Sequence, residues 1–284
     1  MRWGDGRRSD NVEDRRGSPV SRRVVGGGIG TVILVLVAMY FGVDPSTLLN
    51  LLSTTSTPPA ATSPAARPAE ENKMADFVSV VLADTEDTWR DIFQQAGKTY
   101  QEPKLVLFTG AVESACGMAD AAVGPFYCPG DQKVYIDLSF YEDLKNSFQA
   151  PGDFAQAYVI AHEVGHHVQN LLGISKKVHA ARSRVGQKEG NRLSVLQELQ
   201  ADCFAGVWAN HADKARHVLE SGDVEEALNA ASAIGDDRLQ KRSQGTVVPD
   251  AFTHGTSEQR VRWFKNGITS GDIKQCNTFS GEKL

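Results

Sequence analysis

This sequence has few cysteines and carries no net positive charge. The 284 residues include four cysteines, and none of them forms a Cys-x-x-Cys pair, which argues against a zinc site built from cysteine alone. The formal net charge is −5, so we expect no nucleic-acid partner. Hydrophobic residues make up 41% and charged residues 23%, which allows a packed core. No internal repeat is present.

The N-terminal part has a basic stretch followed by an uncharged one. Residues 1–23 carry seven Arg and four acidic residues, and residues 24–43 carry no charge. Twenty helical residues span about 30 Å, the thickness of a bilayer core. The positive-inside rule then predicts a single-pass membrane helix over 24–43, with a cytoplasmic tail over 1–23 and everything after it outside the cytoplasm. A cleaved signal peptide is the alternative, but no clear small-residue cleavage site follows.

A Ser/Thr/Pro/Ala tract separates this N-terminal part from the rest. Residues 53–70 read STTSTPPAATSPAARPAE. Such a composition buries too little apolar surface to offset chain ordering, so we expect a flexible linker over 44–70. One folded domain is predicted over 71–284.

The four cysteines, Cys116, Cys128, Cys203 and Cys276, all lie in the predicted exported domain. An even number in an oxidising compartment suggests two disulfides, for which three connectivities exist. Cys116 and Cys128 are near enough in sequence to close a short loop, which would leave Cys203 with Cys276. A four-cysteine zinc site is the weaker alternative.

Helical patterns dominate the domain. Apolar periodicity and boundary residues predict long helices over 74–96, 154–172 and 191–212, with shorter ones over 140–148 and 257–266. Short β-rich runs over 104–109 and 133–138 predict two strands ahead of the second long helix. The sequence therefore predicts a mostly helical α+β domain with a small β element.

The second long helix contains the stretch AHEVGHHVQN, residues 161–170. His162 and His166 are four apart, so both imidazoles project from one helix face and can meet one zinc ion. Glu163 is about 100° further round the helix and is placed to reach a water on the metal. His167 points elsewhere, and we expect a non-ligand on the helix surface or behind the site.

The third ligand decides the class of metallopeptidase. An extended H-E-x-x-H-x-x-G-x-x-H motif would need Gly at 169 and His at 172, but the chain has Gln169 and Leu172. The other common solution is a glutamate on a later helix. Glu198 begins the stretch ELQAD on a largely apolar helix, so we predict it as the ligand. Asp202, four residues on, is placed to accept the free N–H of a ligand histidine.

At these motifs the chain resembles the bacterial putative neutral zinc metallopeptidases of the gluzincin type. The resemblance covers nearly all of the predicted domain and runs through SACGMADAAVGPFYCPGDQKVYIDLSF, AHEVGHHVQ, ELQADCFAGVW, HGTSEQRVRWF and CNTF. It implies a zincin-like peptidase fold and one zinc ion, and an N-terminal membrane segment is usual there. It also makes a Cys203–Cys276 disulfide more plausible. Under this resemblance the expected location is a bacterial cell membrane, with the domain periplasmic or extracellular.

These parts predict a zinc-dependent endopeptidase. His162, His166 and Glu198 would hold zinc, and Glu163 would act as general base. His254, in a Gly-containing loop, is the first candidate to stabilise the oxyanion, with a structural role as the alternative. The expected partners are a peptide or protein substrate and the membrane through 24–43; no oligomeric state is predicted. The rival interpretations are a zinc-containing binding or scaffold module and a structural envelope component.

Overall fold

The structure is a computed structural model that describes residues 1–17 and 68–280. The predicted membrane helix over 24–43 and most of the predicted linker over 44–70 lie outside these residues. Within residues 1–17 and 68–280, no helix is both long enough and apolar enough to cross a bilayer.

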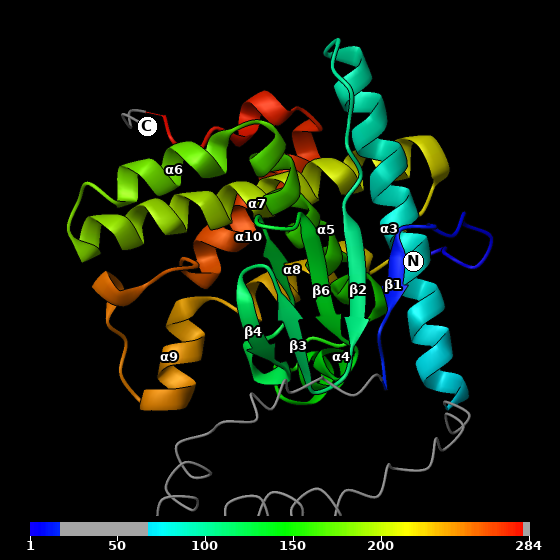
Figure 1. Cartoon of the computed structure of the whole chain (residues 1–284), viewed down its shortest axis with the longest axis horizontal. Coiled ribbons are helices and arrows are strands. Elements are labelled where there is room, and N and C mark those ends of the chain that lie inside the picture. Colours follow the sequence, from blue (N-terminus) through cyan, green and yellow to red (C-terminus); the bar gives the residue numbers. More distant parts are fainter. Residues whose placement is uncertain (18–67, 281–284) are drawn as a thin grey trace, which may run out of the picture. The chain divides into compact units, whose positions relative to one another are not determined.

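Four strands form one sheet in the order β1, β2, β6, β5 (Figure 1). Their bounds are β1 Val12–Asp14, β2 Lys104–Phe108, β5 Phe126–Cys128 and β6 Lys133–Asp137. The first three strands in this order run parallel, and β5 is antiparallel to β6 at one edge. A separate antiparallel hairpin consists of β3 Ala111–Ser114 and β4 Gly117–Asp120. The two strands predicted from the sequence are β2 and β6.

Helices make up most of the remaining described residues, so the predicted mostly helical α+β class is confirmed. The α-helices are α3 Ala69–Gln95, α4 Ser139–Asn146, α5 Asp153–Leu171, α6 Ile174–Arg182, α7 Gln187–Arg216, α8 Asp223–Ala233, α9 Asp236–Gln244 and α10 Ser257–Ser270. Short 3-10 helices are η1 Ala121–Val123, η2 Pro249–Ala251 and η3 Ile273–Cys276. The five helices predicted from the sequence are α3, α4, α5, α7 and α10.

The alternation of side chains along β2 and β6 separates two apolar layers. Leu105, Leu107 and Ile136 point into the large core shared with the helices. Val106 and Tyr135 point to the other face, where they pack with Val112 of the hairpin and other buried residues. Both faces of the sheet are therefore covered, by helices on one side and by the β3–β4 hairpin on the other.

Helix α5 lies in the middle of the helical layer, where it packs against α3, α7 and α8 (Figure 1). Gly165 allows the close approach to α7, because a Cβ there would lie 3.0 Å from the carbonyl oxygen of Ala201. α5 ends just before Gly173, which has a left-handed φ of 75° that favours glycine. The motif helix is thus held close to the helix that carries Glu198.

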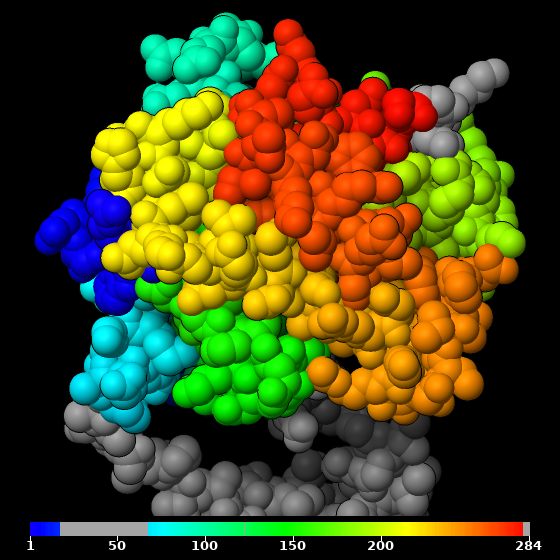
Figure 2. Space-filling model, turned by 180° about the vertical axis from the view of Figure 1, so that it is seen from behind, coloured from blue at the N-terminus to red at the C-terminus, as the bar shows by residue number. Residues whose placement is uncertain are grey.

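Helices α7 and α10 pack closely because each has a glycine where they cross. A Cβ on Gly206 would lie 2.2 Å from the carbonyl oxygen of Phe264, and one on Gly267 would lie 2.0 Å from that of Cys203. In the view of Figure 2 the C-terminal part of the described chain, in red, lies against the stretch in yellow that includes the end of α7. Backbone contact therefore fixes the distance between these two helices.

Both predicted cysteine pairs lie within disulfide-bonding distance and are bonded. Cys116, at the tip of the β3–β4 hairpin, is joined to Cys128 at the end of β5. Cys203 of α7 is joined to Cys276 of η3.

The predicted localisation is wrong. It placed residues 1–23 and the domain on opposite sides of a membrane, but the described residues on both sides of 18–67 form one compact unit. β1 pairs in parallel with β2, and Arg7 and Arg8 form ion pairs with Glu86 and Asp76 of α3. In Figure 1 the blue N-terminal strand lies beside β2 and α3. Residues 1–17 are therefore part of the domain and cannot be separated from it by a bilayer.

Candidate metal centre

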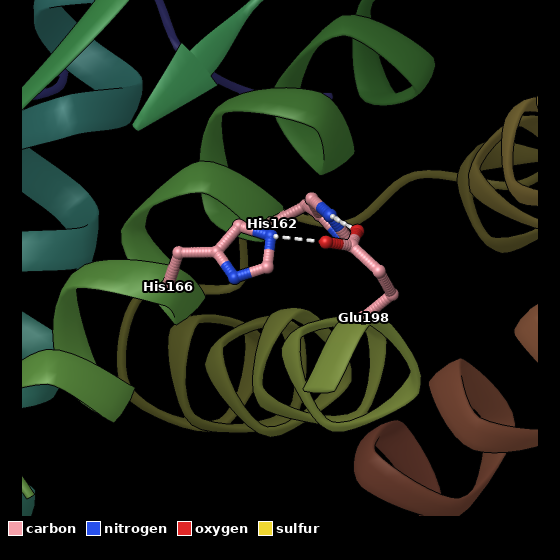
Figure 3. Close-up of side chains that lie close together, drawn as sticks. All are labelled: His162, His166 and Glu198. Carbon is pink, nitrogen blue, oxygen red and sulfur yellow. Dashed lines mark hydrogen bonds and ion pairs between the residues drawn. The ribbon is translucent and has the colours of Figure 1, made fainter. Parts of the chain in front are cut away.

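Three predicted site residues converge between helices α5 and α7. His162 and His166 project from α5, and Glu198 projects from α7 (Figure 3). The Nε2 atom of His162 lies 3.1 Å from Oε2 of Glu198, and that of His166 lies 3.3 Å from Oε1. Ligand atoms of the three residues lie within 4.8 Å of one another. Each residue thus offers one donor atom to the same small volume.

His162 is oriented from behind by a buried polar cluster. Its Nδ1 atom lies 2.8 Å from Oδ1 of Asp202, whose side chain is fully buried. Two nitrogens of Arg260 donate to the two oxygens of Asp202 at 2.9 Å, and the Tyr158 hydroxyl donates to Oδ1 at 2.5 Å. Because Asp202 is an acceptor, the Nδ1 atom of His162 carries the proton and Nε2 is directed at Glu198.

His166 is oriented by Gln169, a residue that the sequence interpretation used only to exclude the extended motif. The amide nitrogen of Gln169 donates to the carbonyl oxygen of Gln197 at 2.7 Å and to Oε1 of Gln200 at 3.1 Å. Gln200 in turn donates to the carbonyl oxygen of Cys276. The remaining Oε1 atom of Gln169, 2.9 Å from Nδ1 of His166, must therefore accept the proton of that ring. Its position three residues after His166, on the same helix face, was the available signal.

Glu163 lies beside the three convergent residues and lines the same cavity, which has a volume of about 520 Å³. Its side chain is buried, and burial raises the pKa of its carboxyl group. Among the described residues, none forms a hydrogen bond or ion pair with this carboxylate. The arrangement suits a group that takes up and releases a proton.

His254 lines the same cavity from the loop before α10. Asp236, at the start of α9, lies 3.1 Å from Nδ1 of His254 and accepts the backbone N–H groups of Thr253, His254 and Gly255. The hydrogen bond to Asp236 raises the pKa of His254. Asp236 was not predicted as a partner of His254, because nothing in the local sequence shows that these residues, eighteen positions apart, come together.

Comparison with known families and proteins agrees with this geometry. A family model described as putative neutral zinc metallopeptidase matches residues 1–279. The chain belongs to this family. It is 56% identical over 288 residues to an Escherichia coli (strain K12) protein named "Uncharacterized protein YpfJ". The matched region covers 98% of this chain and 99% of that protein. It is 38% identical over 262 residues to the Mycobacterium tuberculosis (strain H37Rv) protein named "Uncharacterized protein Rv2575", with 87% and 86% covered. No solved structure matches the chain.

The donor set fits the zinc ion that the description of the neutral zinc metallopeptidase family implies. Two imidazole nitrogens and one carboxylate, with access for water, are typical of catalytic zinc sites. Burial alone would lower the pKa of His162, but the adjacent Asp202 raises it to about 10. Burial would raise the pKa of Glu198, but His166 and His162 hold it well below its usual range. The ionised carboxylate of Glu198 attracts a cation to this volume, and a bound zinc ion would take the place of a proton on each Nε2 atom.

His167 lies away from these donors, in the core. Its Nε2 atom lies 2.6 Å from the carbonyl oxygen of Gln101, and its Nδ1 atom lies 3.1 Å from the hydroxyl of Tyr127. Its ring contacts Tyr100 and Tyr127 edge to face. In this member of the family, His167 therefore links the motif helix to the edge strand β5.

Proposed function

We propose that this protein is a zinc-dependent endopeptidase with a zincin-like fold. His162, His166 and Glu198 would hold one zinc ion, with Asp202 and Gln169 orienting the two imidazoles. Family membership supports a zinc peptidase, and the convergence of the three donor atoms supports the ligand assignment. Peptides or proteins are the proposed substrates.

The position of Glu163 is the observation that carries the proposal. A zinc ion that only stabilises a fold is usually enclosed by four protein ligands. Here three donors converge, and a buried carboxylate without a partner among the described residues lies beside them in an open cavity. A binding or scaffold module has no need of such a group, so hydrolysis is the better account.

The proposed chemistry assigns one proton transfer to Glu163. A bound zinc ion would lower the pKa of a water molecule and polarise the carbonyl group of the scissile amide. Glu163 takes the proton of the water that attacks this carbonyl carbon. It then passes the proton to the leaving nitrogen as the C–N bond breaks.

His254 is proposed to stabilise the oxyanion that forms on the carbonyl oxygen. Asp236 occupies its Nδ1 side, which leaves Nε2 to donate into the cavity. A charged imidazole there would interact more strongly with the developing oxyanion than with the neutral carbonyl oxygen.

The test compares the full chain with its Glu163→Gln variant, which keeps the size of the side chain and removes its basicity. Elemental analysis measures bound zinc, and mass spectrometry follows cleavage of a denatured protein mixture. We expect zinc in both proteins and cleavage about 100- to 10,000-fold slower in the variant. Glu225→Gln, at an exposed position on α8, is the matched control and should cleave normally.

Two results would overturn parts of the proposal. Zinc bound without any cleavage that depends on Glu163 would favour the binding module. Full zinc affinity after Glu198→Ala would show that the third ligand is wrongly assigned.

A further inference from the structure

The cavity beside the metal centre has a second, apolar part. Its lining includes Val123, Phe140, Phe148, Ile234 and Leu239. Apart from the polar cluster already described, the charged side chain in this lining is that of Asp143. A cavity of about 520 Å³ falls within the range of ligand sites, which are mostly apolar with a few placed polar groups.

Aromatic contacts hold the walls of this apolar part together. The rings of Phe140 and Phe148 lie 6.1 Å apart between centroids. Gly124, in the loop after η1, lies opposite Phe140, because a Cβ built on it would come within 3.6 Å of that ring. Arg242 of α9 lies 5.3 Å from the centre of the Phe148 ring and donates to the carbonyl oxygen of Ser147. The two phenylalanine rings thus form an aromatic wall that α9 holds in place through Arg242.

Among the described residues, Val123 and Leu239 lie outside the hydrophobic core clusters. Val123 is 63% exposed, Leu239 is half-buried, and neither packs against the hydrophobic core clusters. Phe140, Phe148 and Ile234, in contrast, do pack against the main core. Two aliphatic side chains from different elements therefore leave apolar surface open inside the cavity, where an apolar ligand group gains by covering it.

We propose that this part of the cavity binds one large apolar side chain, aliphatic or aromatic, of the peptide substrate. The placement of that side chain next to the cleaved bond rests on the proposed function, because Glu163 lines the same cavity. Acidic side chains are disfavoured, since Asp143 adds a further carboxylate to the lining. Val123 and Leu239 are the residues that determine specificity.

Binding tests this inference without relying on turnover. The probes are fluorescein-labelled heptapeptides that are identical except for a central leucine, phenylalanine, serine or aspartate. Their affinities for the full-length, zinc-loaded Glu163→Gln protein are measured by fluorescence anisotropy. Burial of a large apolar side chain predicts that the leucine and phenylalanine peptides bind about 10- to 100-fold more tightly than the serine peptide.

Substitutions at the two specificity residues sharpen the test. In the same background, Val123→Asp and Leu239→Lys should each reduce the preference for the leucine peptide by about 10-fold. Leu239→Lys should also gain affinity for the aspartate peptide, a result that misfolding cannot produce. Val185→Asp is the matched control, because this valine is 42% exposed and lies outside the cavity lining. It should bind like the parent protein.

Equal affinities for the leucine and serine peptides, or binding of none of the four, would overturn the inference. An unchanged preference in both cavity variants would overturn it as well. A preference that is retained while the zinc-loaded wild-type protein cleaves no peptide would support the ligand class and refute the proposed hydrolysis. The two claims therefore fail separately.

Discussion

Proton positions at the two imidazoles depend on residues that touch no substrate. Asp202 and Gln169 accept from the Nδ1 atoms of His162 and His166, respectively, so both Nε2 atoms are directed at Glu198. Outer partners of this kind commonly change metal affinity by about 10- to 100-fold when they are removed. The orientation of Gln169 is fixed, because its amide nitrogen already donates to two acceptors. Its Oε1 atom is therefore left to accept from His166.

Substitution of Gln169 by Met removes the acceptor and keeps much of the volume. We expect zinc to bind about 10- to 100-fold more weakly, as measured by competition with a chelator. Gln187→Met, at the exposed start of α7, is the control and should leave zinc affinity unchanged. Equal affinities in the two variants would show that Gln169 does not set the orientation of His166.

The Asp236–His254 pair predicts a shift in pH dependence. The hydrogen bond to Asp236 raises the pKa of His254, Glu198 raises it further, and burial and Arg260 oppose them. A protonated His254 is present below its pKa, so activity that needs it falls as pH rises through that value. Asp236→Asn lowers the pKa and should move the alkaline limb of kcat/KM to lower pH.

His254→Ala should lower kcat by about 100-fold or more, in line with the loss of an oxyanion donor, and should leave zinc content unchanged. Asp250→Asn, at an exposed position in η2, should keep the parent pH profile. An alkaline limb that does not move in Asp236→Asn would remove His254 from the mechanism.

At the scale of helices, the candidate metal centre depends on small residues where helices cross. Gly165 lies between His162 and His166 in the sequence and faces Ala201 of α7, and Gly206 and Gly267 bring α10 against α7. α7 carries Glu198 and Asp202, and α10 carries Arg260. The spacing of three helices therefore sets whether the donors and their partners meet.

Two glycines of α7 predict opposite changes in stability. A Cβ at Gly206 would overlap backbone atoms of α10, so Gly206→Ala should destabilise the protein by about 1–3 kcal/mol or more. A Cβ at Gly190 would meet only the Arg182 side chain at 4.0 Å, so Gly190→Ala should stabilise by about 0.4–1 kcal/mol. Urea unfolding measures both. A Gly206→Ala protein at least as stable as the parent would mean that the crossing tolerates a methyl group.

The sequence predicted the elements whose signals are local. Apolar periodicity located α5 and α7, and the spacing of His162, Glu163 and His166 located half of the candidate site. Helix α9 was not predicted, because its sequence DDRLQKRSQ is polar and has no clear apolar face. The roles of Gln169 and Asp236 were not predicted, because they depend on tertiary contacts. The sequence alone does not show which group a side-chain amide or carboxylate will bind.

At the scale of the whole molecule, residues 1–17 complete the domain across a long stretch of sequence. β1 escaped prediction because Val12–Asp14 is only three residues long, lies in an Arg-rich segment and forms a strand by pairing with β2. Glu86 of α3 holds this segment: it is buried and accepts from Arg7, Ser9 and Asn11. One carboxylate thus joins the N-terminal segment to the core.

Glu86→Ala should therefore destabilise the full chain by about 2–3 kcal/mol, because buried donors lose their acceptor. Urea unfolding measures the loss, and hydrogen exchange should show less protection of the β1 amides. Asp87→Ala removes a neighbouring and more exposed partner of Arg7, and should cost no more than about 1 kcal/mol. Unchanged protection of β1 in Glu86→Ala would contradict this role.

The pairing of Val12 with Leu105 has a consequence for the order in which the protein acquires its structure. The first strand of the sheet leaves the ribosome long before its partner is made. Roughly 90 residues must be synthesised in between, which takes about 5–20 s at common translation rates. During that time the segment has no strand to pair with, so β1 can join the sheet only after β2 has been made.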